Sequence, residues 1–353
     1  MSKTAEPQLY YSHEAYRSDR IPLQAGSEKR SVLHKFTGTR LPWGYTQDVV
    51  PDNIMEDPKP ESMRFWEQWE KEKAEMKANG KYVPRPFEDV ELHCRYDHER
   101  FRFAQLPFRS QFWLSLRTFC KWGLIILLPL CILIDWLFEM DSAGFNIREL
   151  LNNSITVLVS KILLPPWLVS SVIVNYFPRV WFRPPGGPLW ELNRVTGQVT
   201  IFNSADVKTQ GQTHDIVAPF HEFDAYIVTS PDRQGLPTNG LQLAHRYSAA
   251  TINLSALITP DNTTQKPCAL WDFLQNFMDI QRPLPEIPLY EPYRSQDPTT
   301  SEYDEKNNRP TRYWIDMDNH TFKTKVKDML GKIDSIDTFD RPNLMAKAVQ
   351  YID

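Results

Sequence analysis

Two long apolar runs interrupt an otherwise polar chain. They extend from Trp122 to Phe138 and from Ile155 to Phe177, and each contains a single charged residue, Asp135 or Lys161. About 20 helical residues cross a hydrocarbon core of roughly 30 Å, so the second run is long enough and the first needs the turn before it. The pattern predicts a transmembrane helical hairpin over residues 119–177. Two buried helices of a soluble core are the alternative, which such long uninterrupted apolar runs disfavour.

The flanks of the two runs differ in charge from the segment between them. Basic residues lie on the outer sides, with Arg100, Arg102, Arg109, Arg117 and Lys121 before the first run and Arg179, Arg183 and Arg194 after the second. The connecting segment carries Glu139, Asp141 and Glu149 against one base, Arg148. Cytoplasmic flanks of membrane helices are enriched in Lys and Arg. Both termini are therefore expected in the cytoplasm.

The chain before the runs, residues 1–118, is predicted to be a cytoplasmic arm. Its first 60 residues are rich in Pro, Asp, Lys and Ser and show no sustained period, which is typical of an extended segment. Residues 61–79 change to a helical pattern. Phe65, Trp69 and Met76 fall on one face of this helix, and we expect that face to pack against the rest of the protein.

After the second run the hydrophobic period becomes two. Residues 189–193 and 199–203 predict a β-hairpin in which Gly197 supplies the positive φ of the turn. Further strands are expected at 215–220, 225–230, 242–247 and 251–257. A helical pattern follows, with Leu270, Phe273, Leu274 and Phe277 on one face.

The predicted fold class is α+β. The transmembrane hairpin is followed by a small antiparallel β-roll over residues 188–281, which the amphipathic helix closes. In its order of elements this domain resembles a pleckstrin-homology-type (PH-like) roll. Residues 282–353 are predicted to be an extended, Pro-rich and helical C-terminal tail, with a short helix from about residue 319 to 330.

Asp135 and Lys161 are unusual residues for membrane helices. A charged side chain near the bilayer centre costs about 2.5 to 3.5 kcal/mol on insertion scales. One lies near the end of the first run and the other near the start of the second, so both would lie at similar depth. We interpret them as a charge pair that holds the hairpin together, with a polar contact for a membrane-embedded partner as the alternative. Pro129, Pro165 and Pro166 are expected to kink the helices.

Composition and cysteine spacing disfavour several classes of function and of site. A net charge of -4 gives no general attraction to nucleic acid. The N-terminal residues lack the apolar segment of a cleaved signal peptide, so targeting is expected to depend on the first apolar run. The four cysteines, Cys94, Cys120, Cys131 and Cys268, form no CxxC pair, which disfavours a zinc site and a disulfide framework.

Three groups of titratable side chains are candidates for chemistry. They are His93, Cys94 and His98; His214, Asp215, His221, Glu222 and Asp224; and Asp316, Asp318 and His320. The first group lacks a second set of metal ligands. In the second, a separation of seven residues places the histidines on opposite faces of a regular strand, so a polar rim is favoured over a metal or an acid/base pair.

The third group resembles a calcium loop but lacks the required Gly and Glu. No GxSxG, Walker A or GxGxxG motif is present. We predict no catalytic site, no metal and no cofactor.

Several segments together carry a family resemblance. The hairpin, LWELNRVTGQVTIF, PFHEFDAYIVTSPDRQGLP, ALWDFLQNFMDIQRPLP and EPYRSQDPTTSEYDEKNNRPTRYWIDMD are similar to a family of proteobacterial membrane-hairpin proteins. Genes of that family often lie near spike-protein genes of type VI secretion systems. The family offers no catalytic residues to carry over. The resemblance implies a bacterial inner-membrane location and an association with antibacterial effectors.

Three functions follow as expectations. The first is a non-enzymatic, membrane-anchored protein whose cytoplasmic domain binds a protein partner, such as a type VI effector, in an immunity or accessory role. The second is a membrane-active antibacterial effector whose hairpin inserts into a target bilayer. The third is an enzyme or a lipid-binding PH-like module.

Overall fold

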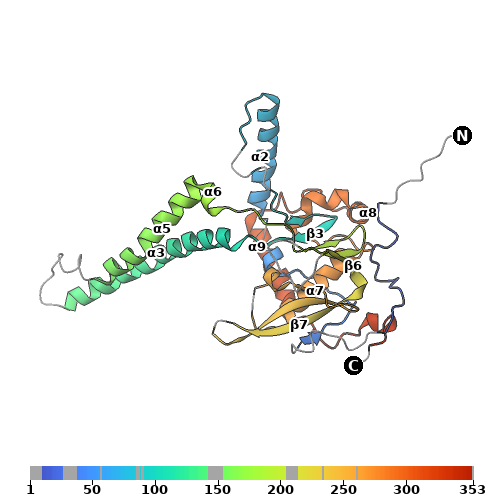
Figure 1. The fold of residues 1–353 in the computed structure, drawn as a ribbon. Helices are drawn as coiled ribbons and strands as arrows, with labels where there is room; N and C mark the ends of the chain where they lie inside the picture. Colours follow the sequence, from blue (N-terminus) through green and yellow to red (C-terminus); the bar gives the residue numbers. More distant parts are fainter. Residues whose placement is uncertain are drawn as a thin grey trace. The chain divides into compact units, whose positions relative to one another are not determined.

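The computed structural model describes residues 10–26, 38–55, 58–84, 88, 91–141, 154–203, 214–232, 234–259 and 261–351. The chain has mixed helix and sheet structure and divides into two compact units (Figure 1). The β unit comprises Met1–Val83, His93–Phe103 and Pro188–Asp353. The helical unit comprises Pro84–Leu92 and Ala104–Gly187.

The β unit contains two antiparallel sheets. The five-stranded sheet has the order β2-β3-β4-β5-β6, with strands Arg95–Tyr96, Arg100–Phe103, Trp190–Asn193, Gln198–Ile201 and Ile216–Pro219. The four-stranded sheet has the order β1-β7-β8-β9, with strands Gly38–Arg40, Phe223–Pro231, Pro237–His245 and Thr251–Asn253. The strands predicted after the second apolar run are confirmed, although β7 and β8 are longer than expected and β9 is shorter.

The β4–β5 turn confirms the role predicted for Gly197. Its φ is +72°, a left-handed conformation that favours glycine. A Cβ at this position would lie 2.6 Å from the Glu14 carbonyl oxygen and 2.7 Å from the Tyr16 nitrogen. Ser12 N–H also donates to the Val195 carbonyl at 2.9 Å. Glycine is therefore required both by the turn and by the N-terminal segment that packs on it.

Helix α7 (Gln265–Met278) fills the interior of the β unit. All twelve residues from Pro267 to Met278 are buried. The predicted apolar face is confirmed, and Trp271 on another face packs edge-on to Trp43 with 4.7 Å between ring centroids. The helix is buried on every side because segments from both ends of the chain cover the part that the sheets do not.

The N-terminal and C-terminal segments contribute to this core, which differs from the predicted arm and tail. Tyr16, Trp43, Trp314 and Met345 are each at most 4 % exposed and belong to one hydrophobic cluster with α7. Trp43 also donates its indole N–H to Asp224 at 3.1 Å. Isolated aromatic residues in Pro-rich sequence give no periodic signal, so their burial depends on contacts with distant strands.

The strands β3 and β4 are neighbours in the sheet although the helical unit separates them in sequence. Phe103 lies opposite Trp190, and the Leu189 N–H donates to the Phe103 carbonyl at 2.8 Å. Both ends of the intervening segment are thus fixed to adjacent strands. The predicted roll began at residue 188, whereas the sheet already starts before the first apolar run.

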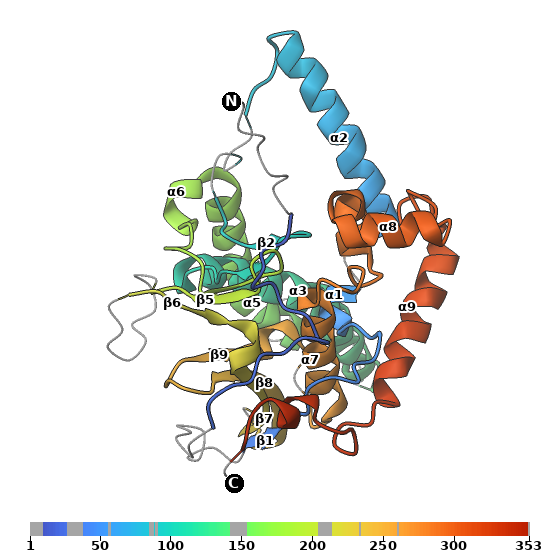
Figure 2. The ribbon, with the colours of Figure 1, turned by 90° about the vertical axis from the view of Figure 1, so that its right-hand side faces the viewer.

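The remaining helices of the β unit lie near its surface. They are α1 (Asp52–Met55), α2 (Pro60–Ala78), α8 (Pro298–Lys306) and α9 (Asn319–Asp334), with 3-10 turns at Phe220–Glu222, Ser255–Leu257, Pro288–Gln296 and Leu344–Lys347. Both views show α2 extending away from the sheets (Figures 1 and 2). Only its first turn is buried, through Pro60 and Met63, whereas Phe65 is 56 % exposed. The expectation that Phe65 packs on the protein is therefore wrong.

Candidate functional site

The helical unit consists mainly of two long apolar helices, α3 (Phe108–Asp141) and α5 (Ile155–Tyr176), followed by the short α6 (Pro178–Trp181). Both α3, over Phe108–Leu137, and α5 are long and apolar enough to cross a membrane. Only 11 % of the most apolar part of each helix is buried. Large apolar side chains such as Ile126, Trp136 and Leu158 are each more than half exposed. These helices therefore do not form the core of the folded chain.

One end of the helix pair is joined through Asp135. Its carboxylate accepts backbone N–H groups of Ile155 at 3.1 Å and Thr156 at 2.9 Å. The Ser154 hydroxyl oxygen accepts the Val157 N–H at 3.2 Å. The first N–H groups of a helix have no partner within it, and the helix dipole favours a negative charge there. Asp135 thus connects the end of α3 to the start of α5.

This arrangement corrects the partner predicted for Asp135. Lys161 is exposed and forms no ion pair within the part of the chain that the structure describes. The free N–H groups at the start of α5 satisfy the carboxylate, whereas Lys161 lies about 9 Å further along the helix. Helix α3 continues through Pro129, and α5 continues through Pro165 and Pro166, each as a single helix.

We expect Asp135→Ala to destabilise the helix pair by about 1 to 3 kcal/mol, because two N–H groups lose their acceptor in apolar surroundings. Lys161→Ala is expected to have little effect, and the double variant should resemble Asp135→Ala. Asp135→Asn is the control that keeps one acceptor oxygen. Thermal unfolding in mild detergent compares all four variants with the wild type, and recovery in the double variant would favour an Asp135–Lys161 ion pair instead.

The opposite end of the helix pair is joined through Ser110. Its hydroxyl donates to the carbonyl oxygens of Trp181 and Arg183, each at 3.2 Å, and accepts the Arg183 N–H at 2.9 Å. The Trp181 indole N–H donates to the Val174 carbonyl at 3.0 Å. Because these groups are buried or half-buried, the start of α3 is fixed beside α6.

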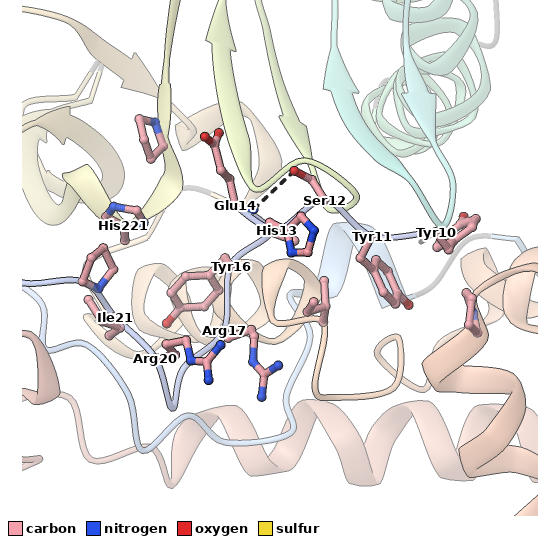
Figure 3. Close-up of a pocket in the computed structure, with 15 residues that line it drawn as sticks. Tyr10, Tyr11, Ser12, His13, Glu14, Tyr16, Arg17, Arg20, Ile21 and His221 are labelled. Carbon is pink, nitrogen blue, oxygen red and sulfur yellow. Dashed lines mark hydrogen bonds between the residues drawn. The ribbon is translucent and has the colours of Figure 1, made fainter. Parts of the chain in front are cut away.

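A pocket of about 860 Å³ opens in the β unit along the N-terminal segment (Figure 3). Residues 10–22 form most of its lining, together with Pro219, His221, Ile280 and Pro298. The Tyr16 ring is buried, and its hydroxyl has no hydrogen-bond partner among the described residues. The sequence does not predict this pocket, because the first 60 residues have the composition of an extended segment.

Seven of the fifteen residues that line the pocket are basic or aromatic, and one, Glu14, is acidic. Arg17 pairs with Asp19 at 3.1 Å, whereas Arg20 and His13 are exposed without an ion pair within the described ranges. Burial lowers the pKa of His221, so its imidazole is neutral at pH 7. Such a lining suits an acidic or aromatic group of a binding partner.

Several of the candidate metal and catalytic residues contact other groups of the protein. His245 contacts Glu222 at 2.9 Å, and Asp224 forms a buried ion pair with Arg246 at 2.8 Å. Asp318 accepts the first N–H groups of α9, and Asp316 pairs with Arg312. His98 stacks between Tyr10 and Tyr293. Among the described residues, no three His, Cys, Asp or Glu side chains are arranged to hold a metal ion.

A buried network around Arg194 and Asp297 was missed from the sequence. Both residues are completely buried, with 3.1 Å between Arg194 Nε and Asp297 Oδ1. The Arg194 guanidinium also donates to the carbonyl oxygens of Phe277, Asp279 and Arg282. Asp297 accepts the Tyr11 hydroxyl at 2.7 Å and the Thr300 N–H at 3.0 Å. These contacts connect four distant chain segments, so their role is structural.

Comparison with protein-family models, with curated proteins and with solved structures found no match to this chain.

Proposed function

We propose that this chain is a non-enzymatic protein of the bacterial inner membrane, anchored by α3 and α5, whose β unit binds a partner protein. The exposure of α3 and α5 is the observation that supports it best. Contiguous apolar patches larger than a few hundred Å² are rare on soluble monomers. Two helices whose apolar parts are only 11 % buried fit a hydrocarbon environment better than water.

The strand pairing supports an even number of membrane crossings. Because β3 and β4 are adjacent, the chain leaves the β unit and returns to it at neighbouring points. Two crossings satisfy this constraint, and one crossing does not. The basic residues Arg109, Arg117 and Arg179 lie at the outer ends of the two helices, as expected for ends that stay in the cytoplasm.

Topology reporters test the anchor. Fusions after Gln105 and Asn203 are expected to report a cytoplasmic location, and a fusion after Asn146 is expected to be exported. The Gln105 fusion is the internal control, because it precedes both apolar helices. An exported signal at Asn203, or release of the chain from membranes by carbonate, would contradict the proposed topology.

The resemblance to proteins encoded near type VI spike genes suggests the kind of partner. We propose that the β unit captures an effector, in an immunity or accessory role, and that the pocket along residues 10–22 takes part. Expression of the chain alone should be harmless, and co-expression should restore growth in the presence of the effector encoded beside it. An Arg20→Glu variant should restore growth less well. Toxicity of the chain alone would favour the membrane-active effector.

The β unit is proposed to be a variant of the PH-like roll. Strands β3–β6 and β7–β9 form successive antiparallel meanders, and the buried helix α7 follows them. This order matches a roll closed by a C-terminal helix. The insertion of α3 and α5 between β3 and β4 would place a membrane anchor in the first hairpin of the roll.

A further inference from the structure

One end of the helix pair carries basic and aromatic side chains. This end is formed by the start of α3 and by α6. We call it the basic end, and define it by Arg109, Arg117, Lys121 and Arg179. None of these four residues forms an ion pair within the described part of the chain. Aromatic rings accompany them, including the Phe112–Trp113 pair at 5.4 Å and the Trp181–Phe182 pair at 5.5 Å.

The helix pair itself offers these cations no acidic partner, because the acidic residues Glu88, Asp89 and Glu91 of the helical unit belong to its segment Pro84–Leu92. Residues 104–134 and 155–187 contain no Asp or Glu. Asp135 lies at the opposite end, where its carboxylate is already bound to the start of α5. The four positive charges therefore need counter-charges from outside the helix pair.

The spacing of the basic residues fits the headgroup layer of a bilayer. At 1.5 Å per residue, Arg117 and Arg109 lie about 27 and 39 Å from Asp135 along α3. Helix α5 ends at Tyr176, about 32 Å from Ile155, and Arg179 follows it in α6. With Asp135 at one boundary of a hydrocarbon core of about 30 Å, these positions bracket the opposite headgroup layer.

The direction of the basic side chains on α3 also favours contact with the headgroup layer. Side chains on a helix tilt toward its N-terminus, which for α3 is the basic end. Lys121 lies within the hydrocarbon core, about 21 Å from Asp135 along α3. Its long side chain can extend toward the basic end and reach the interface. The Ser110 contacts hold α3 and α6 together, so the cations of both segments lie at one end of the unit.

We propose that the basic end binds the phosphate groups of anionic phospholipids, so that the anchor prefers acidic over zwitterionic lipid. This inference rests on the proposed membrane anchor and adds the lipid class to it. Each basic residue near an anionic membrane surface strengthens binding by about fivefold. Trp and Phe at the same level suit the interfacial region, where amphipathic rings are enriched.

The test uses the full chain in mild detergent. Dioleoyl phosphatidylglycerol and dioleoyl phosphatidylcholine are titrated separately, and native mass spectrometry counts the bound lipids. The wild type is expected to bind the anionic lipid at least about tenfold more tightly. A variant with Arg109→Gln, Arg117→Gln, Lys121→Gln and Arg179→Gln should lose that preference.

Two controls separate specific contacts from total charge and from misfolding. Lys323→Gln, Lys327→Gln, Lys332→Gln and Lys347→Gln remove the same number of charges from exposed positions of the β unit and should leave the preference unchanged. Arg109→Lys, Arg117→Lys and Arg179→Lys keep the charges and should retain it. Higher salt should weaken the preference of the wild type.

Equal affinity of the wild type for both lipids would overturn the proposal, as would an unchanged preference in the four-residue Gln variant. Failure of the membrane anchor itself is a different result. In that case carbonate would extract the wild type from vesicles of either lipid. If the chain resists extraction from both kinds of vesicle but shows no lipid preference, the proposed membrane anchor stands and the proposed binding of anionic phospholipid is wrong.

Discussion

Replacing Asp297 with alanine is expected to destabilise the β unit by about 3 to 5 kcal/mol, because it leaves Arg194 as a buried cation without its counter-charge. Both side chains are completely buried. Arg194 would keep its carbonyl acceptors at the end of α7, but none of them carries a full negative charge. Urea unfolding in mild detergent, followed by tryptophan fluorescence, measures the loss.

An exposed Arg–Asp pair provides the matched control. Arg17 and Asp19 also lie 3.1 Å apart, but their side chains are 39 % and 53 % exposed. Asp19→Ala should leave the unfolding midpoint almost unchanged, because water screens an exposed pair. Equal losses for Asp297→Ala and Asp19→Ala would show that burial of the Arg194–Asp297 pair has no energetic consequence.

The same pair predicts a pH dependence. Burial alone would raise the pKa of Asp297, but the charge of Arg194 and hydrogen bonds from Thr300 and Tyr11 hold it below its ordinary value. A carboxyl group with a lowered pKa in the folded state contributes stability above its unfolded pKa of about 3.9. That contribution is lost as the pH falls through the lowered pKa. The stability difference between wild type and Asp297→Asn should therefore shrink below about pH 4.

Local patterns predicted the elements that depend on neighbours in sequence. The β4–β5 hairpin follows from alternating residues around Gly197, and α7 follows from its apolar face at Leu270, Phe273 and Phe277. The two apolar helices follow from their length and composition. In each case the residues that decide the structure lie within about 20 positions, so no knowledge of distant contacts is needed.

Elements that depend on distant partners could not be predicted in this way. Strand β3 has the sequence RFRF, and its pairing with β4 involves residues about ninety positions away. Arg194 occurs in a turn, where an arginine is normally exposed, and only the folded chain brings Asp297 to it. The burial of Trp43 likewise requires α7 and Asp224.

The same difference between local patterns and distant contacts applies to Asp135. Asp135 was recognised as unusual because a carboxylate in an apolar helix needs a partner. The sequence suggests a charged side chain, Lys161, as that partner, whereas the structure provides backbone N–H groups. A sequence shows side chains directly, whereas the free N–H groups of a helix start become evident only when the helix boundary is known.

Phe273→Ala is expected to lower the free energy of unfolding by about 3 to 5 kcal/mol, because it opens a cavity inside the β unit. Phe273 is completely buried in α7 and packs against Phe101 with 5.6 Å between ring centroids. Since Phe101 belongs to β3 and Phe273 to α7, this contact joins the strand before the helical unit to the helix that fills the core.

The control is Phe65→Ala, which removes the same side chain from a helix where it is 56 % exposed. That change should cost less than about 1 kcal/mol, because little apolar surface is returned to water. Urea unfolding in detergent measures both variants against the wild type. A small loss for Phe273→Ala would mean that α7 faces solvent or a partner in solution, and the β unit could not then be a roll closed by this helix.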